Sequence, residues 1–551
     1  MSSPRTGTIG VPRQVSAPEV RTRLRGVSGA IGLAVVRTPE LTIGALAVLV
    51  TAAFSWVPSL WYDEAATVTS AQRSWAQLWA ELHSVDAVHG LYYALMHAWF
   101  WLVGYTPFTL RFPSALAIGV AAALVVALGR RLGGRRLGIV AGLVFLALPR
   151  VQWAGSEGRP YATITTLSVC LTLVGLTAMR RTRSRHHATR WWIAYGALAL
   201  VAVTFNVYLS LAVVAHVVVL LWTLLARRSE LRRASMTVRA QLAPPLVPGR
   251  ALVRWAIASG AAAFVVSPFV LEVVSQSKQV GWIAPVGDRT IAQVFATAWF
   301  GADGVTAAVA WTLMVVGIVA AVVQVRRPSP TVRALFRMQA VRVALPLMVV
   351  PTAVLVGATA LGEHLYSPKY ASLSLPFVAI LIALAVTLLR PKAWLAGAVA
   401  FLLVLSIPAA MAVKQPMAKQ DSTWAKAASI VAAARDAHPD ADEGVVFGSV
   451  YGHPGTTADI IRISYPWAFT GMTDLGVRKN GAESGVLWNQ TGDVATTVPA
   501  RLGDIDTVWF VGGTSRNKEP KTTEVLEQHG FVAEQRWKTG TVIMTEYVRV
   551  R

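Results

Sequence analysis

The sequence predicts an all-α protein that crosses a membrane many times and ends in a small α/β domain. Of its 551 residues, 54% are hydrophobic and only 14% are charged, and the mean hydropathy is +0.51. One soluble core could not bury that much apolar surface. Arginine and lysine cluster between the apolar runs, as they do in cytoplasmic loops. The net charge of +23 therefore indicates topology, and we expect no nucleic-acid partner.

Composition divides the chain into three parts. Residues 1–40 are rich in Arg, Ser, Pro and Gly and contain no apolar core with a cleavage site, which predicts a disordered basic cytoplasmic tail. Residues 41–412 contain the apolar runs and form the predicted transmembrane catalytic domain. Residues 413–551 are more polar and form the predicted extracytoplasmic α/β domain.

About 20 apolar residues cross a bilayer, and the sequence contains twelve candidate segments. They are 41–58, 87–104, 112–129, 137–152, 161–179, 191–205, 207–226, 255–273, 305–325, 343–361, 371–389 and 393–412. With the N-terminus inside, the basic clusters all fall on the cytoplasmic side only if one early segment does not cross. Segment 87–104 contains His89, His97 and several aromatic residues, which favour an interface. We therefore predict about eleven spans, with 87–104 as a re-entrant or juxtamembrane helix on the outer face.

The last span delivers residues 413–551 to the exterior in this topology. Asp421–His438 and Lys521–His529 read as helices. Short apolar strands are predicted at Gly444–Gly448 and Thr507–Gly512, with a strand pair over Phe531–Val550. A small exported α/β domain follows from this pattern.

Two adjacent carboxylates stand out in Trp61-Tyr62-Asp63-Glu64, directly after the first apolar segment. Charged groups cost several kcal/mol in hydrocarbon, whereas at a membrane rim they stay ionised while facing a substrate anchored in the bilayer. The alternative interpretation is a simple polar cap on a helix end.

Four further motifs follow on the same predicted face. They are His89-Gly90-Leu91-Tyr92-Tyr93, Arg111-Phe112-Pro113-Ser114-Ala115-Leu116, Glu157-Gly158-Arg159-Pro160-Tyr161-Ala162 and Ser367-Pro368-Lys369-Tyr370. With Trp61 to Glu64, this order resembles the GT-C glycosyltransferases that use polyprenyl-phosphate sugars, a group related to protein mannosyltransferases and to the aminoarabinose transferase of lipid A. The resemblance covers about residues 40–412. The family usually shows His-Pro-Pro-Leu where this chain has His89-Gly90-Leu91. It shows Arg-Tyr where this chain has Lys369-Tyr370.

The resemblance implies roles for individual residues. Sugar transfer from a polyprenyl phosphate needs a base for the acceptor hydroxyl, and Asp63 is the predicted base. Glu64 is either a second catalytic carboxylate or a group that positions Asp63. Arg159 and Lys369 are predicted to hold the donor phosphate, with His364 as a third donor.

The remaining predicted substrate contacts are His89, Tyr161 and Tyr370. Each has a plainer alternative: a hydrogen-bonded structural histidine for His89, and interface anchors for the two tyrosines. Arg159 has one as well, an ion pair with Glu157. No cofactor is required by the pattern. Asp63, Asp86 and His89 leave a divalent metal site as an alternative without diagnostic spacing.

The predicted function is transfer of a sugar, mannose first, from a polyprenyl-phosphate donor to a cell-envelope glycan, glycolipid or protein, in the plasma membrane. High Ala, Arg and Val usage is typical of a high-GC bacterium, and such transferases occur in actinobacterial envelopes. Arabinofuranose on decaprenyl phosphate is therefore the alternative sugar. A lipid-linked sugar flippase and a noncatalytic membrane scaffold are the alternatives from other classes.

Overall fold

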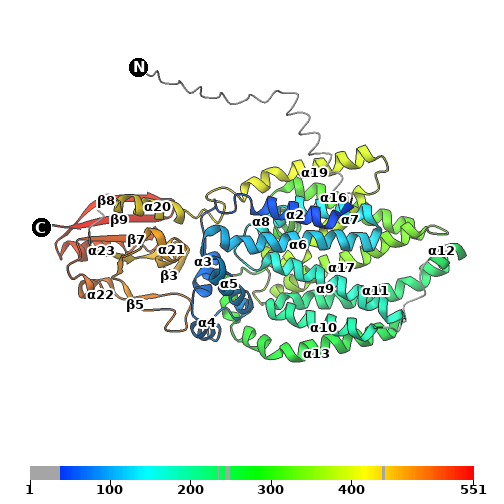
Figure 1. Ribbon diagram of the computed structural model, residues 1–551, viewed down its shortest axis with the longest axis horizontal. Coiled ribbons are helices and arrows are strands. Elements are labelled where there is room, and N and C mark those ends of the chain that lie inside the picture. The colour runs from blue at the N-terminus through cyan, green and yellow to red at the C-terminus, as the bar shows by residue number, and fades with distance from the viewer. Residues whose placement is uncertain (1–36, 185–186, 234, 242–247, 437–440, 551) are drawn as a thin grey trace, which may run out of the picture.

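The computed structural model describes residues 37–184, 187–233, 235–241, 248–436 and 441–550. A long helical bundle forms one part of the molecule, and a small sheet domain sits at one end of it (Figure 1). The short helices α3 (Tyr62–Ala71), α4 (Trp75–Leu82) and α5 (Gly90–Val103) lie between the two parts. The mostly helical fold with a small C-terminal α/β domain confirms the predicted fold class.

Nine helical segments in the described chain are long and apolar enough to cross a membrane. They lie in α6 (Pro107–Gly133), α9 (Tyr161–Ser184), α10 (Ala188–Phe205), α11 (Ser210–Arg233), α13 (Pro248–Ser275), α16 (Gly304–Arg326), α17 (Val332–Ala360), η5 with α18 (Pro368–Ser374 and Leu375–Val386) and α19 (Lys392–Ala412). The pair α7 (Arg135–Ala147) and α8 (Pro149–Gly155) makes a tenth span if it counts as one. The predicted number of about eleven is reached with the shorter apolar helix α2 (Pro39–Ala52).

The break between α7 and α8 has a local cause. The two helices meet at an angle of 70°, and α8 begins at Pro149. Proline has no N–H to donate and its ring clashes with the carbonyl four residues earlier, so it favours a kink or a break in a helix. The bend directs the following loop, Ser156 to Pro160, toward α3.

Basic side chains gather at the end of the bundle that lies away from the sheet domain, which we call the basic end. Arg130 at the end of α6 pairs with Glu40 at the start of α2. Arg136 donates to the backbone oxygen of Leu389, after α18, and Arg337 donates to that of Thr387 at 3.2 Å. These contacts bring three basic clusters that are far apart in sequence to one end, as the parity argument requires.

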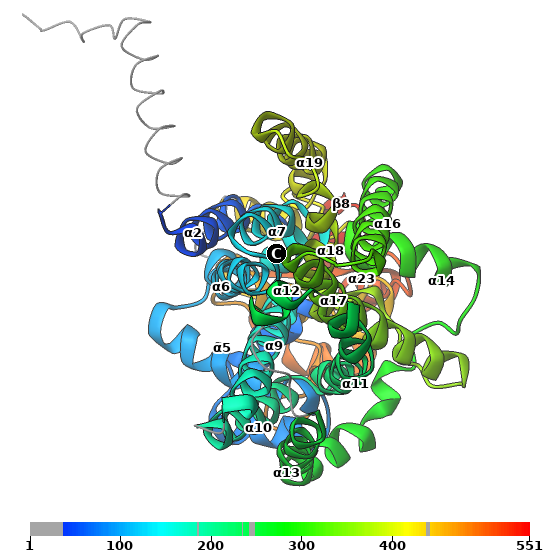
Figure 2. The ribbon, with the colours of Figure 1, turned by 90° about the vertical axis from the view of Figure 1, so that its right-hand side faces the viewer.

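The opposite end, which we call the site end, carries α3, α4 and α5. Figure 2 shows α5 lengthwise, whereas the long bundle helices are seen closer to end-on. Trp101 and Leu102 of α5 are 84% and 69% exposed, as expected for a helix that lies along a membrane surface. The predicted juxtamembrane segment 87–104 therefore takes the form of a short helix across the bundle.

The C-terminal domain is built on a five-stranded mixed sheet of order β4-β1-β7-β9-β8. Its strands are β1 (Glu443–Phe447), β4 (Thr473–Asp474), β7 (Thr507–Gly513), β8 (Phe531–Thr539) and β9 (Val542–Arg549). Strands β4, β1 and β7 are parallel, and β9 runs antiparallel to both β7 and β8. Helices α20 (Trp424–Arg435) and α23 (Glu519–Glu527) match the two predicted helices.

Several small elements of this domain were not predicted. The hairpin β2 (Ser449–Val450) and β3 (His453–Thr457) follows β1, and α21 (Asp459–Ser464) follows the hairpin. A second hairpin pairs β5 (Val477–Lys479) with β6 (Gln490–Thr491). The predicted tail, residues 1–40, lies outside the described residues up to position 36, and α2 begins at Pro39.

Candidate active site

Asp63 and Glu64 lie in the first turn of α3, where the positive end of the helix dipole favours carboxylates. The residue that precedes the helix is Trp61, and no side chain caps the helix start. The two carboxylates instead face different partners. Asp63 Oδ2 accepts a hydrogen bond from Lys369 Nζ at 2.8 Å, and Glu64 pairs with Arg111.

The Asp63–Lys369 pair keeps some contact with solvent, since the side chains are 18% and 15% exposed. Burial alone would raise the pKa of Asp63, but the positive charges of Lys369 and Arg159 outweigh it, so this pKa lies below its usual value. Asp63 is therefore an ionised carboxylate that is already held by a cation. This is the charge state that a general base needs.

Glu64 is fully buried and makes three hydrogen bonds. Arg111 Nε and Nη2 donate to its two oxygens at 2.8 and 2.5 Å, and the backbone N–H of Gly158 donates to Oε1 at 2.8 Å. Arg111 also donates to the carbonyls of Ser55 and Pro58. This bidentate pair joins α3, α6 and the loop after α8, which favours a positioning role for Glu64.

The loop from Ser156 to Pro160 is fixed from several sides. A Cβ on Gly158 would lie 2.6 Å from Cγ of Leu110, so only glycine fits this close approach. Glu157 is fully buried, and its carboxylate accepts from Trp61 Nε1 at 2.5 Å and pairs with Lys419. Glu157 therefore pairs with a lysine from the linker that follows the last span, and not with Arg159.

Arg159 points the end of its side chain toward α3 and α5. Its Nη1 donates to the backbone oxygen of Asp63 at 3.1 Å and to the hydroxyl of Tyr93 at 3.0 Å. Its Nε is buried without a hydrogen-bond partner in the described chain. The positive charge of Arg159 thus lies beside Asp63 and is not neutralised by a carboxylate within salt-bridge distance among the described residues.

Lys369 is the second residue of the short helix η5 and is bordered by aromatic rings. Its Nζ lies 4.9 Å from the ring centre of Trp282 and 5.9 Å from that of Tyr370. Tyr370 in turn stacks on Tyr208 with ring centres 4.5 Å apart. Cations over aromatic faces are stabilised by the ring quadrupole, so this cage holds the ammonium beside Asp63.

His89, Asp86 and Tyr161 also lie at the site end. His89 is buried, its Nδ1 has no partner among the described residues, and burial together with the charges of Arg159 and Lys369 holds its pKa well below the usual value. Asp86 accepts from Tyr93 at 2.7 Å. Within the described ranges, no group of three or more His, Cys, Asp and Glu side chains is arranged to hold a metal. Asp63, Asp86 and His89 are thus not gathered into such a group in the described part of the chain.

The two remaining predicted contacts, Tyr161 and His364, lie in different surroundings. Tyr161 is fully buried at the start of α9 with its ring 5.1 Å from that of Trp153, and its position next to Pro160 keeps it close to Arg159. The imidazole of His364 contacts the backbone oxygen of Ile283 through Nδ1. That contact ties His364 to the loop before α14 (Asp288–Ala292) and gives it a structural partner.

The C-terminal domain contacts the segment that carries Asp63. The imidazole of His453 stacks on the ring of Tyr62 with centres 3.7 Å apart and planes 6° apart, and Trp488 Nε1 donates to the Tyr62 hydroxyl at 2.8 Å. Burial lowers the pKa of His453, and Asp63 partly opposes the shift. The site is therefore bordered by both domains.

Sequence reasoning missed His453, Trp488 and Lys419 as neighbours of the site, and it quoted Arg111 only as part of a motif. The first three follow the last span, so no local spacing connects them with α3. Arg111 carried a signal that could have been used: it is a charge directly before the apolar segment 112–129, and charges at such positions often have buried partners.

Comparison with known proteins adds a sequence match inside the bundle. Residues 89–244 match the family model described as dolichyl-phosphate-mannose-protein mannosyltransferase. The match starts at His89 and includes Arg111 and Arg159, whereas Asp63 and Lys369 lie outside it. A search of curated proteins finds no match to the sequence.

The fold is similar to that of ArnT from Cupriavidus metallidurans in the apo state, with 14% identity and a TM-score of 0.54 over 94% of this chain and 98% of that chain. The chain thus resembles this mannosyltransferase family over residues 89–244 and shares the fold of ArnT. The resemblance that the motifs predicted is thereby confirmed. Two further similar structures are ArnT bound to undecaprenyl phosphate (14% identity, TM-score 0.49, 92% of this chain and 97% of that chain) and the apo oligosaccharyltransferase of Archaeoglobus fulgidus (11% identity, TM-score 0.47, 94% and 75%).

Proposed function

We propose that this GT-C protein transfers a sugar, mannose first, from a polyprenyl-phosphate donor to a hydroxyl of a cell-envelope glycan, glycolipid or protein. The observation that carries the proposal is the ionised Asp63 carboxylate between Lys369 and Arg159 at the site end of the bundle. A base and two phosphate-binding cations in one place are what this reaction needs. The family model matched by residues 89–244 supports mannose as the first sugar to test.

The donor phosphate is proposed to bind Arg159 and Lys369. Arg159 has an unpaired buried Nε, and a guanidinium offers a phosphate a forked pair of donors. Lys369 is held by Asp63 until a phosphate competes for its ammonium. Donor binding would then draw Lys369 toward the phosphate and free the Asp63 carboxylate, so that the base becomes available only when the donor is present.

The transfer is proposed as a single inverting displacement. Asp63 accepts the proton of the acceptor hydroxyl, and the hydroxyl oxygen forms a bond to the anomeric carbon. The bond from that carbon to the phosphate oxygen breaks, and the polyprenyl phosphate leaves with the electron pair. Arg159 and Lys369 stabilise the negative charge that grows on it. Glu64 and Arg111 hold the start of α3 in place.

The site end is proposed to face the exterior, with the N-terminus in the cytoplasm and residues 413–551 outside. The basic end supports this orientation, because positive loops stay in the cytoplasm. Reporter fusions after residue 105 should report outside, and fusions after Arg131 should report inside. A cytoplasmic signal at residue 105 would contradict the orientation.

The decisive experiment supplies radiolabelled polyprenyl-phosphate mannose, and in parallel decaprenyl-phosphate arabinofuranose, to proteoliposomes with envelope extract as acceptor. A new labelled product with one donor identifies both the activity and the sugar. The Arg159→Ala variant should lose turnover, whereas Arg131→Ala at the basic end should keep it. If the labelled donor moves to the other leaflet and no new product forms, the protein is a flippase. If neither donor is consumed or moved, the protein is a noncatalytic scaffold.

A further inference from the structure

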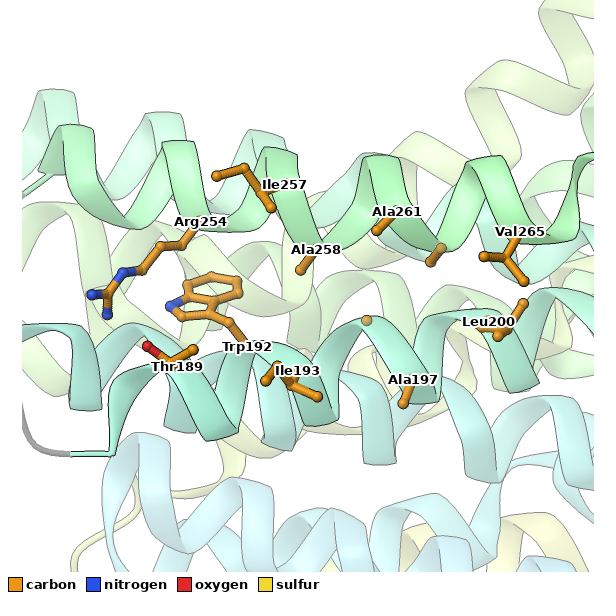
Figure 3. Close-up of a pocket in the computed structure, with 12 residues that line it drawn as sticks. Thr189, Trp192, Ile193, Ala197, Leu200, Arg254, Ile257, Ala258, Ala261 and Val265 are labelled. Atoms are coloured by element: carbon orange, nitrogen blue, oxygen red, sulfur yellow. The ribbon is translucent and has the colours of Figure 1, made fainter.

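A groove of about 430 Å³ lies between α10 and α13, and no residue of α3 lines it. Its walls are aliphatic and aromatic over most of their length, as Figure 3 shows for Ile193, Leu200 and Val265. Ile193, Ile257 and Val265 are all more than half exposed, so the groove opens on the lipid-facing surface of the bundle.

One end of the groove is polar. Figure 3 shows the guanidinium of Arg254 and the hydroxyl of Thr189 at the same end, with the ring of Trp192 beside them. Nη1 of Arg254 is buried without a hydrogen-bond partner in the described chain. No acidic side chain is among the twelve residues that line the groove. A buried donor of this kind favours a negatively charged oxygen as its partner.

The length of the groove matches one leaflet of the bilayer, and the position of its polar end indicates which leaflet. Its lining runs from Thr189 to Leu200 on α10 and from Arg254 to Val265 on α13, and each stretch is about 16 Å long at 1.5 Å per residue. A single leaflet contributes about 15 Å of hydrocarbon. The polar end lies at the start of α10, beside the exposed Arg190, which is the basic end of the bundle.

We propose that this groove binds one anionic phospholipid of the leaflet at the basic end, with an acyl chain along the groove and the phosphate on Arg254 and Thr189. An anionic headgroup is favoured over a zwitterionic one because Arg254 supplies positive charge and the lining contains no carboxylate. The donor's phosphate is proposed to lie at the opposite end of the bundle, so this lipid is a separate molecule.

The bound lipid stabilises the packing of α13 against α10. Only 17% of the apolar window of α13 is buried inside the protein, so α13 packs loosely and gains contacts from a lipid wedged against α10. At its other end, α13 leads into Gln276 and Gln279, which accept hydrogen bonds from the backbone N–H groups of Ala87 and Asp86. The lipid therefore stabilises the helix that holds the turn before His89.

The test measures bound lipid directly and needs no assay of sugar transfer. The full-length protein is reconstituted in nanodiscs of phosphatidylglycerol and phosphatidylcholine, released, and analysed by native mass spectrometry. Wild type should retain one phosphatidylglycerol. Arg254→Gln should lower its affinity for phosphatidylglycerol about tenfold, which is about 1.4 kcal/mol of binding free energy, because the phosphate loses a charged hydrogen-bond donor. Arg190→Gln, at the same end but outside the lining, should retain the lipid.

A second pair of variants tests the groove itself. Ala261 lines the groove, and Ala263 is equally exposed on α13 but does not. Ala261→Trp should displace the lipid, and Ala263→Trp should keep it. Equal occupancy in all variants, equal retention of phosphatidylcholine, retention of polyprenyl phosphate instead, or a dimer in place of the lipid would each overturn the proposal.

Discussion

The two ends of the helical bundle use charge in opposite ways. At the basic end Arg130 is 49% exposed and pairs with Glu40 at the surface, whereas at the site end Arg111 and Glu64 are fully buried and share a bidentate contact. The Arg130–Glu40 pair at the basic end keeps its water. Arg111 and Glu64 lose their water and must therefore have partners, which fixes the positions of both side chains.

The largest expected effect tests this contrast through stability. Glu64→Gln or Arg111→Met leaves a buried charge without its partner and should lower the free energy of unfolding by about 3–5 kcal/mol. Glu40→Gln at the basic end should change it by about 1 kcal/mol or less. Unfolding in mixed micelles with increasing SDS measures both. Similar losses at the two ends would contradict the contrast.

The second prediction concerns catalysis. Asp63→Asn keeps the shape of the side chain but cannot take up the acceptor proton, so transfer should fall about a hundredfold or more. Donor binding, measured with labelled polyprenyl-phosphate sugar, should persist. Asp63→Asn should also unfold less readily than Glu64→Gln. Full activity in Asp63→Asn would remove Asp63 as the base.

A smaller effect is expected where the C-terminal domain meets the site. His453→Gln removes the stack on Tyr62 and should lower transfer by at most about tenfold, because such aromatic pairs contribute about 0.5–1.5 kcal/mol. Tyr451→Ala lies in the same hairpin, is 55% exposed, and serves as the control. If both variants behave as wild type, the stack of His453 on Tyr62 does not take part in the reaction.

The smallest effect is a change in the shape of the pH profile. The pKa of Asp63 is lowered by Lys369 and Arg159 against the effect of burial, so Asp63 stays ionised and should produce no acid limb between pH 5 and 8. In Lys369→Met one cation is lost, the pKa of Asp63 rises, and kcat/KM should begin to fall at a higher pH than in wild type. Lys278→Met, an exposed lysine in η3 (Ser277–Val280), should keep the wild-type profile.

The same contrast explains what could be predicted from sequence. The lengths of the apolar segments and the basic clusters predicted the spans and the crosswise α5. The strands and helices of the C-terminal domain were also predicted, because each of these features depends on local composition. The Asp63–Lys369 contact joins positions 306 apart, yet the motifs named both residues. Lys419, His453 and Trp488 were not predicted as neighbours of the site. The buried Glu157 and the half-buried Tyr62 need polar partners, but the sequence does not show which distant segment supplies them.

The ion pair of Glu157 and Lys419 has a consequence for biosynthesis. The two residues are 262 positions apart, and ribosomes add about 5–20 residues per second, so Glu157 waits on the order of tens of seconds for its lysine. Until α19 and the linker that carries Lys419 have been synthesised, the loop that carries Arg159 lacks this anchor. A nascent chain that stalls before residue 419 therefore remains without a complete site.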